Sequence, residues 1–235
     1  MQSPPKLGTR TSPASPASRG FTLIELLVVV GIIAMMIGLS ALAVRGVNTS
    51  AVSKAASQVT SGLSLARQTA ITKNTSAAFL IANQTGEGFR DDAFRHWAVV
   101  YSNRGSNTWT LTKDWEALPK GAVIIETRGP NGGATYQSAN AMPIPQSPGQ
   151  PFTPSSFDES ANFTVVNASF GGDIPCVVFS PTGAAGRANH RKGIRVAAGS
   201  VDGNQVTLIS TNSYYFIETD GAIGRIRMRD PESYR

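Results

Sequence analysis

Residues 21–44 form an apolar run in which Glu25 is the only charged residue and no proline occurs. As a helix rising about 1.5 Å per residue, this run would extend roughly 36 Å, more than the roughly 30 Å of a bilayer's hydrocarbon core. A carboxylate near that core costs on the order of 2–3 kcal/mol. The run therefore predicts a membrane-spanning helix, and Glu25 requires a specific explanation.

Residues 1–20 precede the run and are rich in Pro, Ser and Ala without apolar periodicity, so we expect them to be disordered. A secretory signal is one interpretation, because Ala41-Leu42-Ala43 resembles a signal-peptidase site whose cleavage would release a soluble exported domain. A plain single-span anchor is another, and it accounts for the length of the run. Neither interpretation accounts for a glutamate near its start.

The stretch Arg19-Gly20-Phe21-Thr22-Leu23-Ile24-Glu25 closely resembles the processing site of type IV prepilins and type II secretion pseudopilins. In that family a membrane peptidase cuts after the glycine and methylates the new N-terminal residue. The resemblance implies cleavage after Gly20, N-methylation of Phe21, and pairing of Glu25 with the free amine of a neighbouring subunit. It also implies one crossing of the bacterial inner membrane, with the N-terminus cytoplasmic and the C-terminal domain periplasmic.

The chemistry of an ion pair agrees with this implied role of Glu25. Cleavage after Gly20 would create an α-amine that is largely protonated near neutral pH. A carboxylate in apolar surroundings is costly alone and tolerable when paired. The expected partners are therefore a prepilin peptidase and other pilin or pseudopilin subunits, with Glu25 fixing the register of their contact.

Beyond the apolar run, the sequence becomes amphipathic over 45–75, with Val, Leu and Ala mostly at three- and four-residue steps. No proline occurs over 17–118, so we expect one helix over about 22–73 whose small residues pack against a sheet. Within it, Ala66-Arg67-Gln68-Thr69-Ala70 is similar to the ARxxA stretch of GspH-type minor pseudopilins.

From residue 76 onward, short β-branched and aromatic segments alternate with Gly, Asn and Asp clusters, which predicts strands and turns. Strands that follow one long helix favour an antiparallel sheet laid against it, giving an α+β, pilin-like fold. We expect a hairpin at Asp202-Gly203-Asn204 and a long loop around 127–160. The expected strands are 77–82, 97–101, 109–111, 123–125, 177–179, 194–196, 206–209, 214–218 and 226–228.

Two further stretches resemble the end of a GspH-type domain. Val178–Gly183 contains an F-x-P-x-G strand and turn, and Gly224–Arg227 forms a GRxR-like end. Together the resemblances favour a minor pseudopilin of type II secretion. They divide the chain into a cleaved leader 1–20, a transmembrane half-helix 21–44, an amphipathic half-helix 45–75 and a β-rich domain 76–235.

No arrangement of catalytic residues is evident, so we expect neither an enzyme nor a cofactor. His96 and His190 are the only histidines, and the single cysteine, Cys176, lies beside an expected core strand, where a buried inert thiol is typical. Asp91-Asp92 and Asp202-Gly203-Asn204 carry oxygen ligands suited to Ca²⁺. A solvated loop and a tight turn explain them, so we expect no metal site.

Basic residues give the chain a formal net charge of +6, and the leader contributes three of them without an acid. Arg225, Arg227 and Arg229 alternate along the last expected strand, which would project them from one face. Some minor pilins bind DNA through a GRxR stretch, so the resemblance makes Arg225 and Arg227 candidate contacts to nucleic-acid phosphates in a DNA-uptake system. A solvated edge strand whose charges deter aggregation explains the same residues, and this is the favoured interpretation.

Overall fold

The structure is a computed structural model of the chain. It describes residues 23–83, 93–104, 107–128, 148–152, 154, 160–166, 173–186, 191–203, 205–211 and 213–229, with side-chain exposure for all of these except 37–49, 126–128, 160, 191 and 192. Two compact units divide the chain, Met1–Ala43 and Val44–Arg235, and each is described by itself.

Helix α1 spans Leu23–Lys73, which confirms the C-terminal end expected for the helix, whereas residue 22 lies outside the described residues. It ends in a Schellman motif, in which the N–H of Asn74 donates to the carbonyl of Ile71 (3.2 Å) and the N–H of Thr75 donates to the carbonyl of Ala70 (3.1 Å). Asn74 takes a φ of 48°. Asparagine tolerates this left-handed conformation better than most residues, so the helix stops here and the chain turns into the first strand.

Within the described residues, the strands form two antiparallel six-stranded sheets, whereas the sequence predicts a single one. The first sheet has the order β3-β2-β1-β8-β7, and β4 also pairs with β2. Its strands are β1 (Ala77–Ile81), β2 (His96–Ser102), β3 (Trp109–Leu111), β4 (Glu116–Ala117), β7 (Ser160–Ala161) and β8 (Ile174–Phe179).

The second sheet has the order β12-β11-β9-β10-β6, and β5 also pairs with β9. The hairpin expected at 202–204 is confirmed, because Gln205 pairs with Asp202 across a turn in which Gly203 has a φ of 58°. The strands are β5 (Ala122–Arg128), β6 (Pro151–Phe152), β9 (Arg191–Asp202), β10 (Gln205–Leu208), β11 (Tyr214–Asp220) and β12 (Ile226–Arg229).

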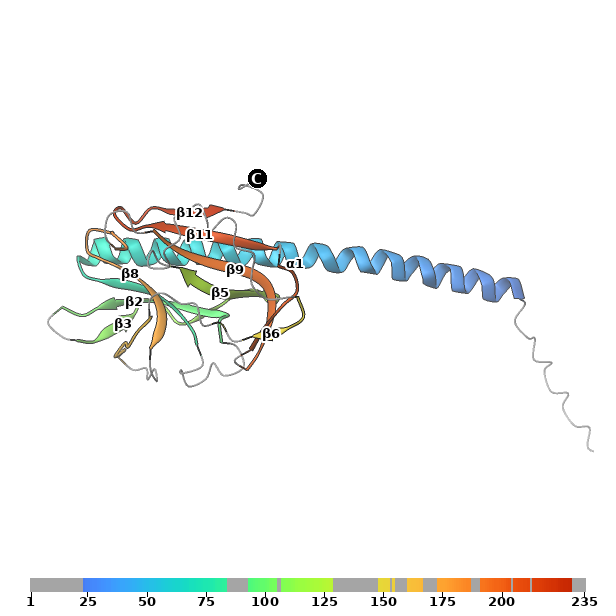
Figure 1. Ribbon diagram of the computed structural model, residues 1–235, viewed down its shortest axis with the longest axis horizontal. Coiled ribbons are helices and arrows are strands. Elements are labelled where there is room, and N and C mark those ends of the chain that lie inside the picture. Colours follow the sequence, from blue (N-terminus) through green and yellow to red (C-terminus); the bar gives the residue numbers. More distant parts are fainter. Residues whose placement is uncertain are drawn as a thin grey trace, which may run out of the picture. The chain divides into compact units, whose positions relative to one another are not determined.

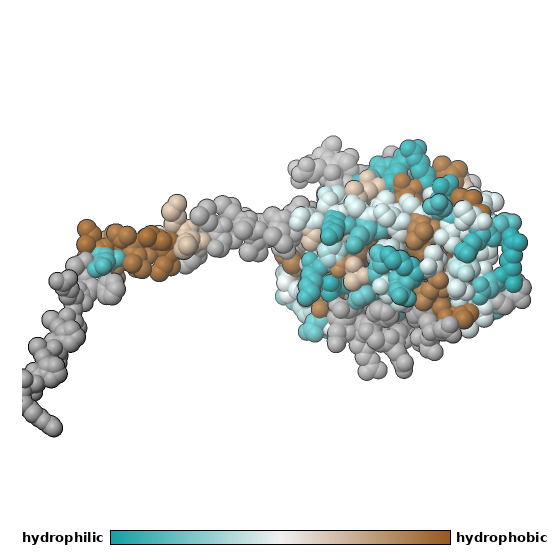
Figure 2. All heavy atoms as spheres, turned by 180° about the vertical axis from the view of Figure 1, so that it is seen from behind, coloured by the Kyte–Doolittle hydropathy of each residue, from teal (hydrophilic) through white to brown (hydrophobic). Residues whose placement is uncertain are grey.

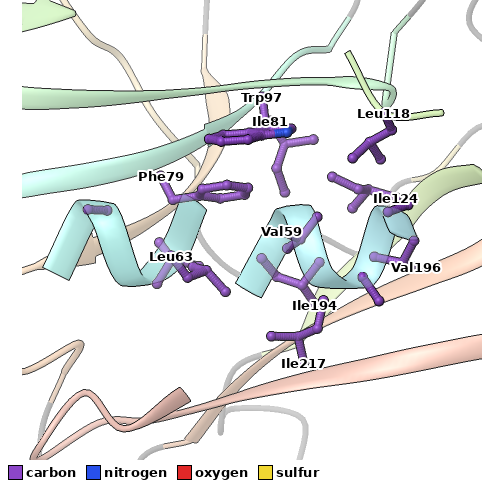
Figure 3. Packing of buried hydrophobic residues seen from close by; sticks show 14 of the residues in the cluster. Val59, Leu63, Phe79, Ile81, Trp97, Leu118, Ile124, Ile194, Val196 and Ile217 are labelled. Carbon is purple, nitrogen blue, oxygen red and sulfur yellow. The ribbon is translucent and has the colours of Figure 1, made fainter. Parts of the chain in front are cut away.

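The main core lies around the C-terminal part of α1, between the two sheets. Figure 1 shows β11 and β12 on one side of this part of the helix, and β2 and β3 on the other. In Figure 3, Phe79 and Trp97 of the first sheet lie on one side of the helix, and Ile194 and Ile217 of the second sheet lie on the other. The fully buried residues of α1 are Val52, Ala55, Ala56, Val59, Leu63, Ala66 and Ala70.

At Gly62 the backbone of α1 lies close against side chains of the first sheet. A Cβ at this position would lie 2.6 Å from Cζ3 of Trp97 and 2.7 Å from Cε2 of Phe79. These two rings stack with their centroids 5.4 Å apart and an interplanar angle of 22°. The small-residue stripe read from the sequence therefore brings the helix backbone against aromatic rings.

Every strand expected from the sequence is present, although several extend beyond the expected bounds and β1 and β10 end one residue before them. The strands that sequence reasoning missed are β4, β6 and β7, each of two residues. The long loop expected around 127–160 contains β6 and the end of β5, and most of its other residues lie outside the described part of the chain.

Candidate functional site

The residues expected to direct processing and assembly belong to the first unit. Gly20 and Phe21 lie outside the described residues. Glu25 lies in the first turn of α1, and its side chain is exposed. A carboxylate in a first turn interacts favourably with the positive end of the helix dipole, so Glu25 suits the start of a helix.

Large apolar side chains are exposed all around Glu25. Leu23 is 84% exposed, and the other aliphatic residues and methionines over 24–36 are all about half-exposed or more. Figure 2 shows them as brown surface along the N-terminal segment of the helix. An uncovered apolar surface of this kind marks a contact with another protein or with lipid.

The transmembrane half-helix expected over 21–44 is not shown by the structure. In the part of the chain that the structure describes, no helix combines the length and the apolar character needed to cross a bilayer. The side chains of residues 37–49, which include the end of the expected segment, lie outside that part.

Of the three arginines near the C-terminus, Arg227 and Arg229 lie in β12, and the carbonyl of Arg225 accepts a hydrogen bond from the N–H of Asp220, at 2.9 Å. Strand β12 begins one residue after Arg225, so Arg225 belongs to the preceding connection. Nε of Arg229 lies 3.0 Å from Oε2 of Glu218, which is only 3% exposed. Because a buried carboxylate is costly without an opposite charge, Arg229 has a structural role. Arg225 and Arg227 remain exposed.

Three stretches that carry the GspH resemblance, 66–70, 178–183 and 224–227, meet at one junction. Nε of Arg67 donates a hydrogen bond to the carbonyl oxygen of Gly183, at 3.3 Å. A Cβ on Gly224 would overlap that same carbonyl oxygen and lie 3.0 Å from Nε of Arg67. Gly183 and Gly224 have φ values of 81° and 63°. The left-handed backbone at Gly183 and Gly224, and the contact of Gly224 with the carbonyl of Gly183, therefore require glycine at both positions.

Backbone hydrogen bonds hold this junction together. The N–H groups of Ala185 and Gly186 both donate to the carbonyl of Gly221, at 2.9 and 3.0 Å. In the connection between β11 and β12, Oδ1 of Asp220 accepts from the N–H groups of Ala222 and Ile223, at 3.0 and 3.2 Å. This is the Asx-turn pattern, which fixes a tight connection without help from other elements.

Beside the junction lies an open hollow of about 620 Å³. Sequence reasoning did not find it, because its two halves come from α1 and from the β11–β12 connection, which are far apart in the chain. In the sequence, the two features that belong to the hollow are Arg67, within a stripe of small residues, and the Gly224-Arg225 pair. Neither feature shows that the two segments meet. The lining residues are Ser64, Arg67, Gln68, Ile71, Ile223, Gly224, Arg225 and Ile226.

The other candidate residues take structural or surface positions where they are described. His96 is half-buried at the start of β2, and Cys176 is 2% exposed in β8. Asp202 is exposed at its hairpin, whereas His190 and Asp91-Asp92 lie outside the described residues. Among the residues described, no three His, Cys, Asp or Glu side chains gather in a way that would hold a metal ion.

Comparison with known proteins gives one finding for the N-terminal part of the chain. Residues 15–41 match the prokaryotic N-terminal methylation motif. The match supports the type IV pilin and pseudopilin family, and it implies processing by a prepilin peptidase and assembly with other pilin-like subunits. Searches of curated proteins and of solved structures gave no match. The matched stretch ends before residues 66–70, so the GspH-type resemblance remains a prediction.

Proposed function

We propose that the chain is a minor pseudopilin of type II secretion. In this proposal it is a structural, non-catalytic subunit, cleaved after Gly20, N-methylated at Phe21 and assembled through residues 21–44. The methylation motif over 15–41 carries the pilin-like part of the proposal, supported by the exposed apolar side chains that surround Glu25. The assignment to type II secretion rests on the resemblance of residues 66–70, 178–183 and 224–227 to GspH-type domains.

Assembly would follow from the chemistry of the new N-terminus. Cleavage places a cationic amine on Phe21, four residues before Glu25, which is about one helical turn. The exposed aliphatic side chains of one subunit would pack against those of the next, and lipid would surround them before assembly. In that setting, the carboxylate of Glu25 and the amine of a neighbouring Phe21 stabilise one register, because other registers leave charges in apolar surroundings.

Mass spectrometry of the mature chain tests the proposal. We expect an N-terminus at Phe21 carrying one additional methyl group, and retention of the protein in the inner-membrane fraction. Replacing Gly20 with Leu should leave an unshifted precursor on a gel. Gly8→Leu, a glycine substitution elsewhere in the leader, is the matched control and should mature normally. An N-terminus at Val44 would instead indicate release by signal peptidase and would refute the proposal.

The alternative of a DNA-binding minor pilin has weaker support. Nucleic-acid binding without sequence preference needs several cations along one surface. Here Arg229 neutralises a buried carboxylate, and Arg225 precedes the strand that carries Arg227. The geometry therefore favours assembly over nucleic-acid contact as the function.

A further inference from the structure

The hollow beside the glycine junction has the composition of a binding site. It lies between the C-terminal turns of α1 and the β11–β12 connection, entirely within the second unit. Its volume of about 620 Å³ falls in the range of roughly 300–1,000 Å³ that ligand-binding clefts occupy. The hydrogen bonds of the junction fix both of its walls.

Two guanidinium groups give the hollow its charge, and none of the described residues that line it is a carboxylate. Arg67 is held in place by the hydrogen bond from Nε to Gly183, so its two Nη groups stay available as donors. Arg225 is exposed, and its side chain has no hydrogen bond or ion pair with any other described residue. Asp220, in the same connection as Ile223 and Gly224, uses Oδ1 within its own turn.

Aliphatic surface lies next to these charges. Ile71 is 44% exposed and Ile223 is 58% exposed, and both line the hollow. We propose that the hollow binds a segment of a partner protein that presents a carboxylate side chain beside an aliphatic one. The carboxylate would accept hydrogen bonds from Arg67 and Arg225, and the aliphatic side chain would cover Ile71 and Ile223.

A peptide carboxylate fits this lining better than nucleic acid does. Proteins that bind single strands stack bases on aromatic side chains, and the lining contains none. Duplex binding relies on cations spread along the phosphates, whereas here two cations face one small volume flanked by isoleucines. The inference stands apart from the proposed assembly through residues 21–44, so either can fail without the other.

The test uses residues 44–235, because every buried hydrophobic residue that the structure describes lies at Val52 or beyond. The ¹⁵N-labelled domain is titrated with the peptide acetyl-Gly-Ser-Leu-Glu-Ser-Gly-amide and followed by NMR. We expect saturable shifts at the amides of Ile223 and Gly224. Arg225→Gln should weaken binding about tenfold or more, as expected for the loss of a charge-assisted hydrogen bond. Arg227→Gln is the matched control, an exposed arginine outside the hollow, and should leave binding unchanged.

Several results would overturn the proposal. Equal weakening by Arg227→Gln would show a diffuse charge effect instead of a site. Equal binding of the same peptide with Gln in place of Glu would show that the carboxylate is not recognised. The same shifts with sodium acetate at the same concentration would show that the aliphatic side chain is not recognised. Displacement of the peptide by a short DNA duplex would make nucleic acid the ligand. Tighter peptide binding after deletion of residues 230–235 would make the chain's own tail the occupant.

Discussion

At the scale of single residues, the contact between Gly183 and Gly224 gives the GRxR-like end of the chain a structural explanation. Gly224 lies against the backbone of Gly183, and Arg67 bonds to the same carbonyl. The resemblance of 224–227 to DNA-binding minor pilins therefore includes a glycine that the fold requires whether or not DNA binds. A test of nucleic-acid binding has to substitute Arg225 or Arg227 and leave Gly224 in place.

Gly224→Ala should destabilise the second unit by at least about 3 kcal/mol, because a left-handed alanine costs about 1 kcal/mol and its Cβ would also displace the backbone of Gly183. Gly149→Ala is the matched control, since Gly149 has a φ of 80° but open space around it. That variant should cost only about 1 kcal/mol. Urea unfolding of residues 44–235 measures both values. Equal destabilisation by the two substitutions would show that the Cβ added at Gly224 does not clash with the backbone of Gly183.

The proposed processing site could be read from the sequence because the residues assigned to it are close together in the chain. Gly20, Phe21 and Glu25 lie within one short stretch next to a long apolar run. The hollow could not be identified in this way, because Arg67 and Arg225 come together only through the packing of α1 against the β11–β12 connection. The role of Arg229 was missed for the same reason, since its partner Glu218 lies on a neighbouring strand.

At the scale of elements, the helix and the expected strands followed from periodicity, but their grouping did not. Strand β1 pairs with β8, and β5 pairs with β9, across long stretches of intervening chain. Such pairing depends on which apolar faces meet around α1, so the sequence predicted one sheet where two are present. The two-residue strands β4, β6 and β7 are too short for any period to be recognised.

Gly62→Ala gives a test of helix packing in which two effects have opposite signs. Helix propensity alone favours alanine by about 1 kcal/mol. The rings of Phe79 and Trp97 leave no room for the added Cβ, and overpacking of this kind costs about 1–3 kcal/mol. We expect net destabilisation of about 1 kcal/mol, measured by thermal or urea unfolding.

Ser61→Ala is the control for the Gly62 variant, because Ser61 is the neighbouring residue and is exposed. It should be neutral or should stabilise the domain by up to about 0.5 kcal/mol through helix propensity. If Gly62→Ala proved as stabilising as this control, α1 would not approach the first sheet as closely as the structure describes.

At the scale of the whole molecule, the two units differ in what they bury. The buried core that the structure describes belongs to the second unit, and the exposed apolar surface over 23–36 belongs to the first. Deleting residues 1–43 should therefore leave the urea midpoint of the domain unchanged within about 0.3 M, because the described core and the surface that its unfolding exposes both stay in the fragment. Tryptophan fluorescence during urea unfolding gives the midpoint of the full chain in detergent and of the fragment. A much lower midpoint for the fragment would show that the first unit stabilises the domain.

Glu25→Ala should separate membrane insertion from assembly. The variant should be cleaved and retained in the membrane like the native chain, because neither step requires the carboxylate in the proposed mechanism. Its incorporation into filaments should fall at least about tenfold, since the loss of one paired charge in apolar surroundings costs several kcal/mol. Quantitative immunoblotting of sheared filaments and of membranes measures both steps, and normal incorporation would refute the role proposed for Glu25.

Cys176 gives the molecule a built-in reporter. It is the chain's one cysteine, it is 2% exposed, and it lies opposite Leu80 in the pairing of β8 with β1. The thiol is buried in a cluster that includes Leu80, Phe163 and Ile174, so an alkylating reagent reaches it only when this cluster opens. Where the cluster closes faster than the reagent reacts, the alkylation rate reports the local opening equilibrium. If the chain assembles as proposed, pulse alkylation in intact cells would compare unassembled with assembled subunits without any engineered label.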